Sequence, residues 1–378
     1  MPEIEPIALS ALTTLRVGAA PLRMFDAGTR DELVDTLRTL WAEHEPVLVL
    51  GGGSNLFVGD EPFDGSVVRV RTQGIERLPS PREGFVRLRV EAGHDWDALV
   101  AYAVDAGLAG IEAMSGIPGT VGAAPVQNIG AYGQEIVQTI VEVDLIDEST
   151  GEVSTVPAAE LGLGFRTSVL KHHYGSAPER RAVILSVSLE LAEIGPGERP
   201  IHGAQLRTAL GLDPEQAVTL AWIREHVLAT RASKGMVLDP TDPDTASAGS
   251  FFQNAIVSAS FARTLPAACP RWPVAPDVDP VLVIPLASWD GQVPPPPSGE
   301  PDVKVSAAWL IEQSGVRKGF KIPRSRAGVS TKHALALTNR GNASAAELAE
   351  LARYIQGRVQ SEFGLILQPE PVLIGVEL

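Results

Sequence analysis

The sequence contains little cysteine and no long apolar run. Its single cysteine among 378 residues, Cys269, allows no internal disulfide and fits a reducing compartment. No apolar run approaches the ~20 residues that cross a bilayer, and the opening stretch MPEIEPIALS lacks the basic and apolar regions of a signal peptide. We therefore expect a soluble cytoplasmic protein without a membrane partner.

Positive charge is also scarce. The 31 Lys and Arg residues against 46 Asp and Glu residues give a formal net charge of −15. Duplex nucleic acid and anionic membrane surfaces repel such a chain, so we expect neither as a partner. A hydrophobic share of 44% is ample for sizeable cores, and a chain of this length usually divides into two or three domains.

Helical and strand-like periodicities both occur along the chain, which indicates a fold that mixes helices and strands. Helices are expected from Thr29 to Leu40, from Asp95 to Gly107, over 213–230 and from Ser344 to Gly364. Strands are expected over 47–50, 85–91, 140–146, 182–191, 365–367 and 372–374. Eleven of the 30 prolines lie between Pro266 and Pro301, which excludes a helix or a central strand there and predicts an exposed loop.

A first glycine-rich loop directly follows the expected strand at 47–50. It consists of Gly51, Gly52, Gly53, Ser54 and Asn55. Three residues without side chains let a ligand approach the backbone N–H groups, and the next two add hydrogen-bonding capacity. A plain turn that needs positive φ angles explains the glycines equally well.

A second glycine-rich stretch runs from 115 to 133. Its candidate ligand contacts are Ser115, Gly116, Ile117, Pro118, Gly119, Gly122, Asn128, Gly130, Tyr132 and Gly133. The glycine spacing differs from the Rossmann fingerprint, and no Walker lysine follows either loop, which excludes a P-loop nucleotidase. Two such loops, each after a β segment, indicate one extended phosphate-bearing ligand, such as a dinucleotide, held between two subdomains.

Six blocks of sequence resemble the UDP-N-acetylenolpyruvoylglucosamine reductase family, in its loop-bearing form, and occur in the family's order. They are VLGGGSNLF (Val49–Phe57), SGIPGTVGAAPVQNIGAYG (Ser115–Gly133), FRTSVLK (Phe165–Lys171), GSFFQN (Gly249–Asn254), AAWLIEQ (Ala307–Gln313) and LQPEPVLIG (Leu367–Gly375). Together they span nearly the whole chain.

The resemblance implies an α+β fold. A two-subdomain FAD-binding fold of the vanillyl-alcohol-oxidase type would hold FAD non-covalently, and a third domain would close over a UDP-sugar. The first FAD subdomain would comprise 1–78 and 362–378, the second 79–225, and the substrate domain 226–361. The implied reaction uses NADPH to reduce UDP-N-acetylglucosamine enolpyruvate to UDP-N-acetylmuramate, a peptidoglycan precursor, in a monomeric cytoplasmic enzyme.

Three residues match the family's catalytic positions. Hydride addition to a double bond conjugated with a carboxylate needs stabilisation of developing negative charge and a proton donor. By resemblance, Arg166 and Glu370 polarise the substrate carboxylate, and Ser250 donates the proton. Without the resemblance, an ion-pairing arginine, a turn serine and an acidic turn residue are the ordinary interpretations.

Five further residues are expected to contact the substrate by their positions in the family's motifs. They are Arg231, Lys234, Asn254, Gln313 and His202. A diphosphate needs local cations, which Arg231 and Lys234 would supply. His202 stands where the loop-bearing form has a tyrosine, so it either contacts a phosphate or is an inert loop residue.

Other functions receive less support from the sequence. The adjacent His172 and His173 have no partner at metal-ligand spacing, so no metal site is expected. Five basic residues between Arg317 and Arg326 indicate either a rim that attracts phosphate groups or a solvated basic face. An FAD oxidase with flavin tethered through histidine is disfavoured, because neither glycine loop contains histidine. A non-enzymatic UDP-sugar or flavin binder would not need Ser250, Arg166 or Glu370.

Overall fold

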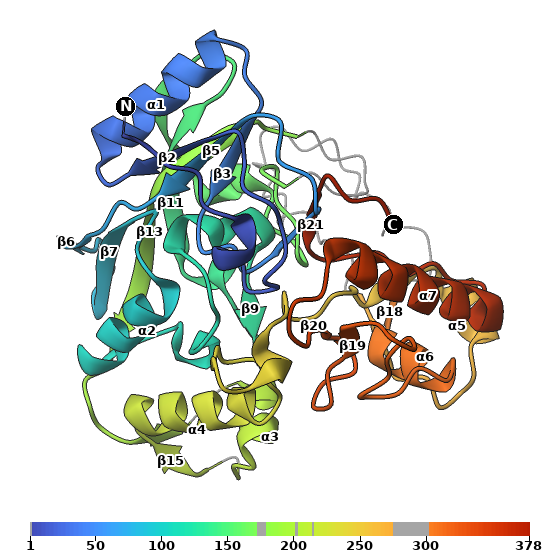
Figure 1. Cartoon of the computed structure of the whole chain (residues 1–378). Helices are drawn as coiled ribbons and strands as arrows, with labels where there is room; N and C mark the ends of the chain where they lie inside the picture. The colour runs from blue at the N-terminus through green and yellow to red at the C-terminus, as the bar shows by residue number, and fades with distance from the viewer. Residues whose placement is uncertain (1, 172–178, 201–202, 214, 275–301) are drawn as a thin grey trace, which may run out of the picture.

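The computed structural model describes residues 2–171, 179–200, 203–213, 215–274 and 302–378, and it shows three parts (Figure 1). The first part is a small, mainly parallel sheet with strand order β1 (Glu3–Ile4), β2 (Arg23–Ala27), β5 (Ser66–Val70) and β3 (Val47–Leu50). Helix α1 (Arg30–Ala42) packs on it, and the capping box of Thr29 with Glu32 confirms the start expected from the sequence.

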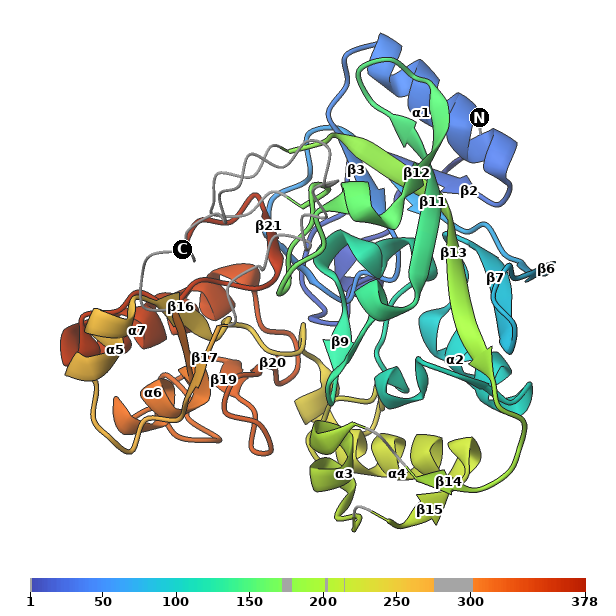
Figure 2. The same cartoon turned by 180° about the vertical axis from the view of Figure 1, so that it is seen from behind.

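The second part is a larger antiparallel sheet, seen best from behind (Figure 2). Its strand order is β12 (Val153–Pro157), β11 (Ile140–Asp147), β13 (Ala182–Glu193), β7 (Phe85–Glu91) and β6 (Ile75–Pro79), and β8 (Leu108–Ala109) also pairs with β13. Helix α2 (Trp96–Asp105) shares an apolar core with this sheet and with α1. The whole of β6 belongs to this sheet, so the subdomain boundary expected between 78 and 79 falls inside this strand.

Helix α4 (Leu220–Ala232) lies beside α2 at the base of the molecule, and α3 (Ala204–Leu210) packs against α4 (Figure 1). The helix expected over 213–230 was wrong at its start, because β15 (Ala217–Val218) pairs there with β14 (Arg199–Pro200). Thr219 then begins α4, since its side chain accepts a hydrogen bond from the Trp222 backbone N–H at 3.1 Å.

The third part has an apolar core of its own and forms the orange and red lobe of Figure 1. It contains β16 (Ala255–Val257), β18 (Val303–Val305), β17 (Arg271–Pro273), β19 (Ala327–Val329), β20 (Leu337–Asn339), α5 (Ala259–Thr264), α6 (Ala307–Gln313) and α7 (Ala345–Phe363). Helix α7 begins with a capping box and ends at Gly364, as expected.

The proline-dense segment was expected to be an exposed loop, but its described beginning includes strand β17. Proline is tolerated there because β17 lies at the edge of the sheet order β16-β18-β17. The rest of that expectation, over 275–301, lies outside the described residues.

The C-terminal strand β21 (Val372–Ile374) returns to the first part, where it pairs in parallel with β4 (Leu56–Val58). The strand expected over 365–367 is not formed; Leu367 instead buries its side chain in the core of the third part. Phe57 of β4 also reaches that core, with its ring centroid 5.6 Å from that of Phe251. The first and third parts are therefore joined by the β4–β21 pair and by the packing of Phe57 against the core of the third part.

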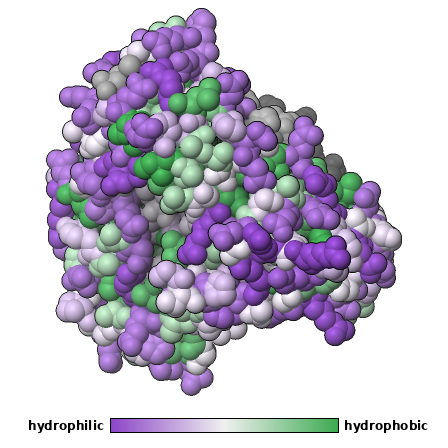
Figure 3. Space-filling model, viewed as in Figure 1, coloured by the Kyte–Doolittle hydropathy of each residue, from purple (hydrophilic) through white to green (hydrophobic). Residues whose placement is uncertain are grey.

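The surface seen in Figure 3 is mostly hydrophilic, with apolar patches interspersed, several of them beside the hollow near its centre. In the part of the chain that the structure describes, no helix combines the length and the apolar character needed to cross a membrane.

Candidate active site

The two glycine-rich loops are in direct contact. A Cβ atom on Gly52 would lie 2.6 Å from the Gly119 Cα, and one on Gly51 would lie 2.5 Å from the Thr120 Oγ1. Neither position therefore accommodates a side chain while the loops keep this approach. Gly53, at φ +61°, and Gly116, at φ +72°, also need the left-handed conformation. In the first loop, the alternative explanation as a turn of positive φ thus holds for Gly53.

A cavity of about 1010 Å³ opens beside these loops, between the first and second sheets. Gly51, Thr120 and Gly122 belong to its wall, together with apolar side chains such as Val49 and Ile184. Its volume and its mixture of glycine backbone, apolar and charged walls fit a dinucleotide. The residues present are thus compatible with FAD.

Several predicted cofactor residues shape the second loop through their side chains. The buried Ser115 Oγ donates to the Glu112 carbonyl at 2.7 Å, and the buried Asn128 Nδ2 donates to the Gly164 carbonyl and to Glu135, each at 2.9 Å. A Cβ on Gly130 would lie 2.6 Å from the Gln134 carbonyl oxygen. Ile117 and Pro118 are half-buried. Contact of these residues with the cofactor stays a prediction.

Arg166 and Glu370, 204 positions apart in the sequence, meet in the structure. The Arg166 Nε lies 3.4 Å from the Glu370 Oε1. The other guanidinium nitrogens donate to the carbonyls of Asn128 at 3.2 Å and Gly130 at 2.9 Å. The arginine is thereby fixed between the second glycine loop and the C-terminal segment.

The Glu370 carboxyl is largely buried, with 15% of its side chain exposed. Burial raises its pKa above the ordinary value, although the positive charges of Arg166 and Lys171 act in the opposite direction. The site therefore favours a glutamate that keeps its proton to higher pH than an exposed one.

Ser250 is held next to Glu370 through the backbone. The Glu370 N–H donates to the Phe251 carbonyl at 2.8 Å, and Phe252 forms a β-bridge with Pro369. Both phenylalanine rings are buried, whereas Ser250 is half-buried. The structure thus brings all three predicted catalytic residues to one place.

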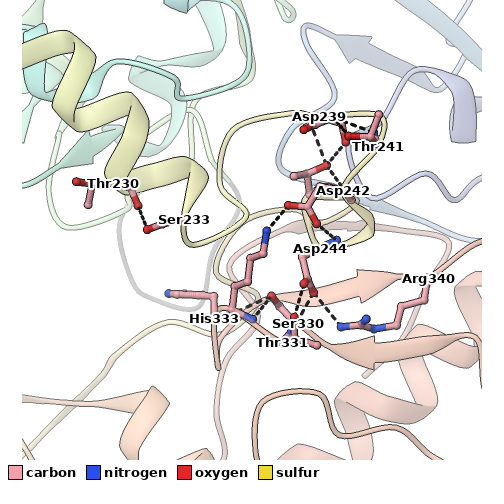
Figure 4. A network of polar contacts seen from close by, with 12 residues as sticks. Thr230, Ser233, Asp239, Thr241, Asp242, Asp244, Ser330, Thr331, His333 and Arg340 are labelled. Atoms are coloured by element: carbon pink, nitrogen blue, oxygen red, sulfur yellow. Dashed lines mark hydrogen bonds and ion pairs between the residues drawn. The ribbon is translucent and has the colours of Figure 1, made fainter.

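The segment that leads to Ser250 is anchored by the polar network shown in Figure 4. The buried Asp244 accepts hydrogen bonds from Thr331 and from the Arg340 guanidinium, the latter at 2.8 Å. Asp242 pairs with Lys332 at 2.6 Å. These contacts tie the chain between α4 and Ser250 to the loop between β19 and β20 and to Arg340, directly after β20.

Sequence reasoning assigned no role to Lys171 or Gln127. Lys171 donates to the Glu370 backbone carbonyl and to Gln127. The available signal was the lysine at the end of the block FRTSVLK, directly after two apolar residues. Sequence reasoning also missed Lys304. Its ammonium lies 4.5 Å from the centroid of the Phe165 ring, and the Arg166 guanidinium carbon lies 5.6 Å from the same centroid.

The predicted substrate residues are only partly brought together. The Lys234 ammonium lies 5.6 Å from the centroid of the Tyr132 ring. Arg231 is buried in α4 and donates to the carbonyls of Met236 at 3.1 Å and Gly116 at 3.4 Å. Both cations therefore lie beside the second glycine loop.

The other substrate candidates lie apart from these cations. Asn254 accepts a hydrogen bond from the Ala307 N–H at the start of α6, whereas Gln313 is exposed at the other end of that helix. His202 lies outside the described residues.

Of the remaining sequence-based candidates, His172 and His173 lie outside the described residues. The described residues contain no cluster of three or more His, Cys, Asp or Glu side chains that fits a metal ion. The five basic residues between Arg317 and Arg326 are all exposed, which is compatible with either interpretation of them.

Comparison with known proteins shows the family to which the chain belongs. Residues 239–374 match the family model of the C-terminal domain of UDP-N-acetylenolpyruvoylglucosamine reductase, and residues 21–156 match an FAD-binding domain. The chain is 52% identical to UDP-N-acetylenolpyruvoylglucosamine reductase of Leifsonia xyli, over 99% of this chain and 100% of that protein. It is 47% identical to the reductase of Saccharopolyspora erythraea, over 98% and 95% of the two chains.

A solved structure shares the fold. The crystal structure of UDP-N-acetylenolpyruvylglucosamine reductase from Thermus caldophilus is similar with a TM-score of 0.58, at 26% identity, over 98% of each chain. The full-length identities to the curated relatives, together with the FAD-binding match, establish the assignment. This chain belongs to the UDP-N-acetylenolpyruvoylglucosamine reductase family of FAD-binding oxidoreductases.

Proposed function

We propose that the protein uses NADPH to reduce UDP-N-acetylglucosamine enolpyruvate to UDP-N-acetylmuramate, with Arg166, Glu370 and Ser250 as the catalytic residues. Bound FAD would accept a hydride from NADPH and supply it to the enolpyruvyl double bond. The observation that carries the proposal is the convergence of these three residues beside the glycine loops. The most direct evidence for this convergence is the distance of 3.4 Å between the Arg166 Nε and the Glu370 Oε1.

Arg166 would bind the substrate carboxylate and stabilise the negative charge that develops on it. A guanidinium keeps its charge at every physiological pH and presents planar donors that match a carboxylate. Two backbone carbonyls already hold the arginine in place. Little reorganisation is then needed when charge develops.

Glu370 would assist Arg166 as a proton-bearing group. Because burial raises the pKa of this carboxyl, it is suited to donate a hydrogen bond to the substrate carboxylate. Two carboxylates that both carried a full charge would repel each other at this site.

Ser250 would donate a proton to the carbon next to the one that receives the hydride. Hydride and proton together saturate the double bond, and the serine oxygen regains its proton from solvent. A serine hydroxyl is a weak acid, so its contribution depends on placement beside the carbon where charge builds. The Glu370–Phe251 hydrogen bond supports this assignment, because it holds the segment of Ser250 against that of Glu370.

Lys234 and Arg231 would attract the diphosphate of the substrate, and Asn254 and Gln313 the rest of the UDP-sugar. The position of Lys234 over Tyr132 supports its part of this proposal. We further propose that the protein acts as a monomer in the cytoplasm, where its single cysteine stays reduced.

Ser250→Ala tests the assignment of the proton donor. In anaerobic stopped-flow experiments, flavin reduction by NADPH should proceed at the wild-type rate, because no proton from Ser250 is needed there. Reoxidation by the substrate should slow by at least ~10²-fold, the low end for a positioned general acid.

Ser258→Ala is the matched control, because Ser258 is exposed, caps α5 and, within the described part of the chain, otherwise hydrogen-bonds through its side chain only to the nearby Ser260 hydroxyl. It should leave both half-reactions unchanged. An equal loss in both half-reactions of Ser250→Ala would contradict the role of Ser250 as proton donor.

A further inference from the structure

Lys171 is a buried lysine at the back of the catalytic residues. Only 6% of it is exposed. Its ammonium donates to the Glu370 backbone carbonyl at 2.9 Å and to the Gln127 Oε1 at 3.0 Å. It thus contacts the backbone of the residue whose carboxyl faces Arg166.

Lys171 belongs to a network of hydrogen bonds. The Asn55 Nδ2 also donates to the Gln127 Oε1 and, at 3.3 Å, to the Glu370 carbonyl. The Asn55 carbonyl in turn accepts from the Val372 N–H at 2.9 Å. Both glycine-rich segments, the Arg166 segment and the C-terminal segment are therefore joined by this network.

A buried ammonium is costly for stability. Burial lowers the pKa of Lys171, which shows that its environment disfavours the charge. A buried ionic group of this kind is often replaceable by a well-packed apolar side chain without loss of stability. Stability alone therefore does not explain a lysine here.

We propose that Lys171 is a positioning residue, which fixes the backbone of Glu370 and places a positive charge behind its carboxyl. This proposal rests on the proposed function, in which Glu370 acts on the substrate carboxylate. From the other side, the Glu370 N–H is bonded to the Phe251 carbonyl. Fixing Glu370 therefore also fixes the register of Ser250.

The positive charge of Lys171 affects the pKa of the Glu370 carboxyl in a predictable direction. Two cations act on the Glu370 carboxyl: Arg166, at 3.4 Å, and Lys171. Both hold its pKa below the level that burial alone would set. Loss of the Lys171 charge should therefore raise the pKa of Glu370.

Lys171→Met and Gln127→Glu test the proposal together in the full-length protein loaded with FAD. Methionine removes the ammonium, whereas glutamate at 127 keeps the lysine and neutralises its charge locally. The measurement is the rate at which UDP-N-acetylglucosamine enolpyruvate reoxidises the reduced enzyme as a function of pH. Flavin content and the rate of reduction by NADPH are measured on the same samples.

We expect both variants to shift the apparent pKa of reoxidation upward. Lys171→Met should also slow reoxidation by about 10- to 100-fold, because the Glu370 backbone loses its anchor. Lys171→Arg should restore the pH profile, and flavin reduction by NADPH should stay close to wild type. Arg353→Met, which removes an exposed cation of α7, should change nothing.

Coincident pH profiles of wild type and Gln127→Glu would overturn the proposal, as would equal losses of Lys171→Met in both half-reactions. If Lys171→Met does not fold, Gln127→Glu and Lys171→Arg still decide between these results. A wild-type enzyme that the substrate does not reoxidise would instead contradict the proposed function.

Discussion

His333 is a titratable group that the proposed reaction does not use. Burial, together with the charges of Lys234 and Lys318, lowers its pKa to about 4. Within the described residues, its buried Nδ1 has no hydrogen-bond partner. His333 lies in the loop between β19 and β20, and Thr331 of the same loop donates a hydrogen bond to Asp244, which anchors the segment leading to Ser250 (Figure 4).

The low pKa of His333 predicts a pH-dependent stability. Between pH 6.5 and about 4, the unfolded chain binds a proton at this histidine that the folded chain does not bind. Stability should therefore fall as the pH falls through this window. His333→Gln should remove that contribution, worth at most about 3 kcal/mol.

Urea unfolding at about pH 7.5 and about pH 4.5 measures this difference. His44→Asn, at an exposed histidine, serves as the control and should behave as wild type. If His333→Gln loses as much stability on acidification as wild type does, the histidine is not buried in its neutral form.

At the scale of elements, helices α2 and α4 fix the second glycine loop at Gly116. The Asp97 Oδ1 accepts from the Gly116 N–H at 2.6 Å and is paired with Arg224, also at 2.6 Å. Arg231 reaches the Gly116 carbonyl from α4. Gly116 itself is buried at φ +72°, and a Cβ there would lie 2.7 Å from the Leu228 Cδ2.

Gly116→Ala should therefore displace the loop and weaken FAD binding. We expect a loss of stability of about 1–3 kcal/mol from the positive φ and the contact with α4. The matched control is Gly84→Ala, which has a similar φ of +76° but nothing within 4 Å of the added Cβ. The flavin-to-protein ratio after gel filtration and the thermal midpoint measure the two effects. Equal flavin retention in both variants would contradict the importance of this contact.

The elements that the sequence predicted best have local causes. Helices α1 and α7 begin at capping boxes, and β7 alternates buried and half-buried residues over its seven positions. The errors arose where distant contacts decide. The start of α4 is set by β15, which precedes it and pairs with β14. Leu367 buries its side chain in the core of the third part instead of forming a strand.

At the scale of the whole molecule, the active site is assembled from segments that are distant in sequence. The pairing of β21 with β4 brings Glu370 to the glycine loops, and the packing of Phe251 on Phe57 brings Ser250 there. The catalytic residues could be assigned from the family resemblance, but no local pattern in the sequence predicted the hydrogen-bond network around Lys171. That network depends on four segments that meet only in the folded chain.

The overall charge is a poor guide to this site. The chain carries a net charge of −15, yet the proposed substrate, reductant and cofactor are all anionic. Arg166 and Lys171 at the catalytic residues and Lys234 beside Tyr132 provide positive charge locally. Placed cations at short range therefore outweigh the distant acidic surface, whose field is screened by salt.

The most direct test of the central claim is the absorbance of the flavin in the purified protein under anaerobic conditions. The protein should carry a flavin spectrum that NADPH bleaches, and addition of UDP-N-acetylglucosamine enolpyruvate should restore it with one NADPH consumed per substrate. A protein without flavin absorbance, or a reduced flavin that this substrate does not reoxidise, would contradict the account.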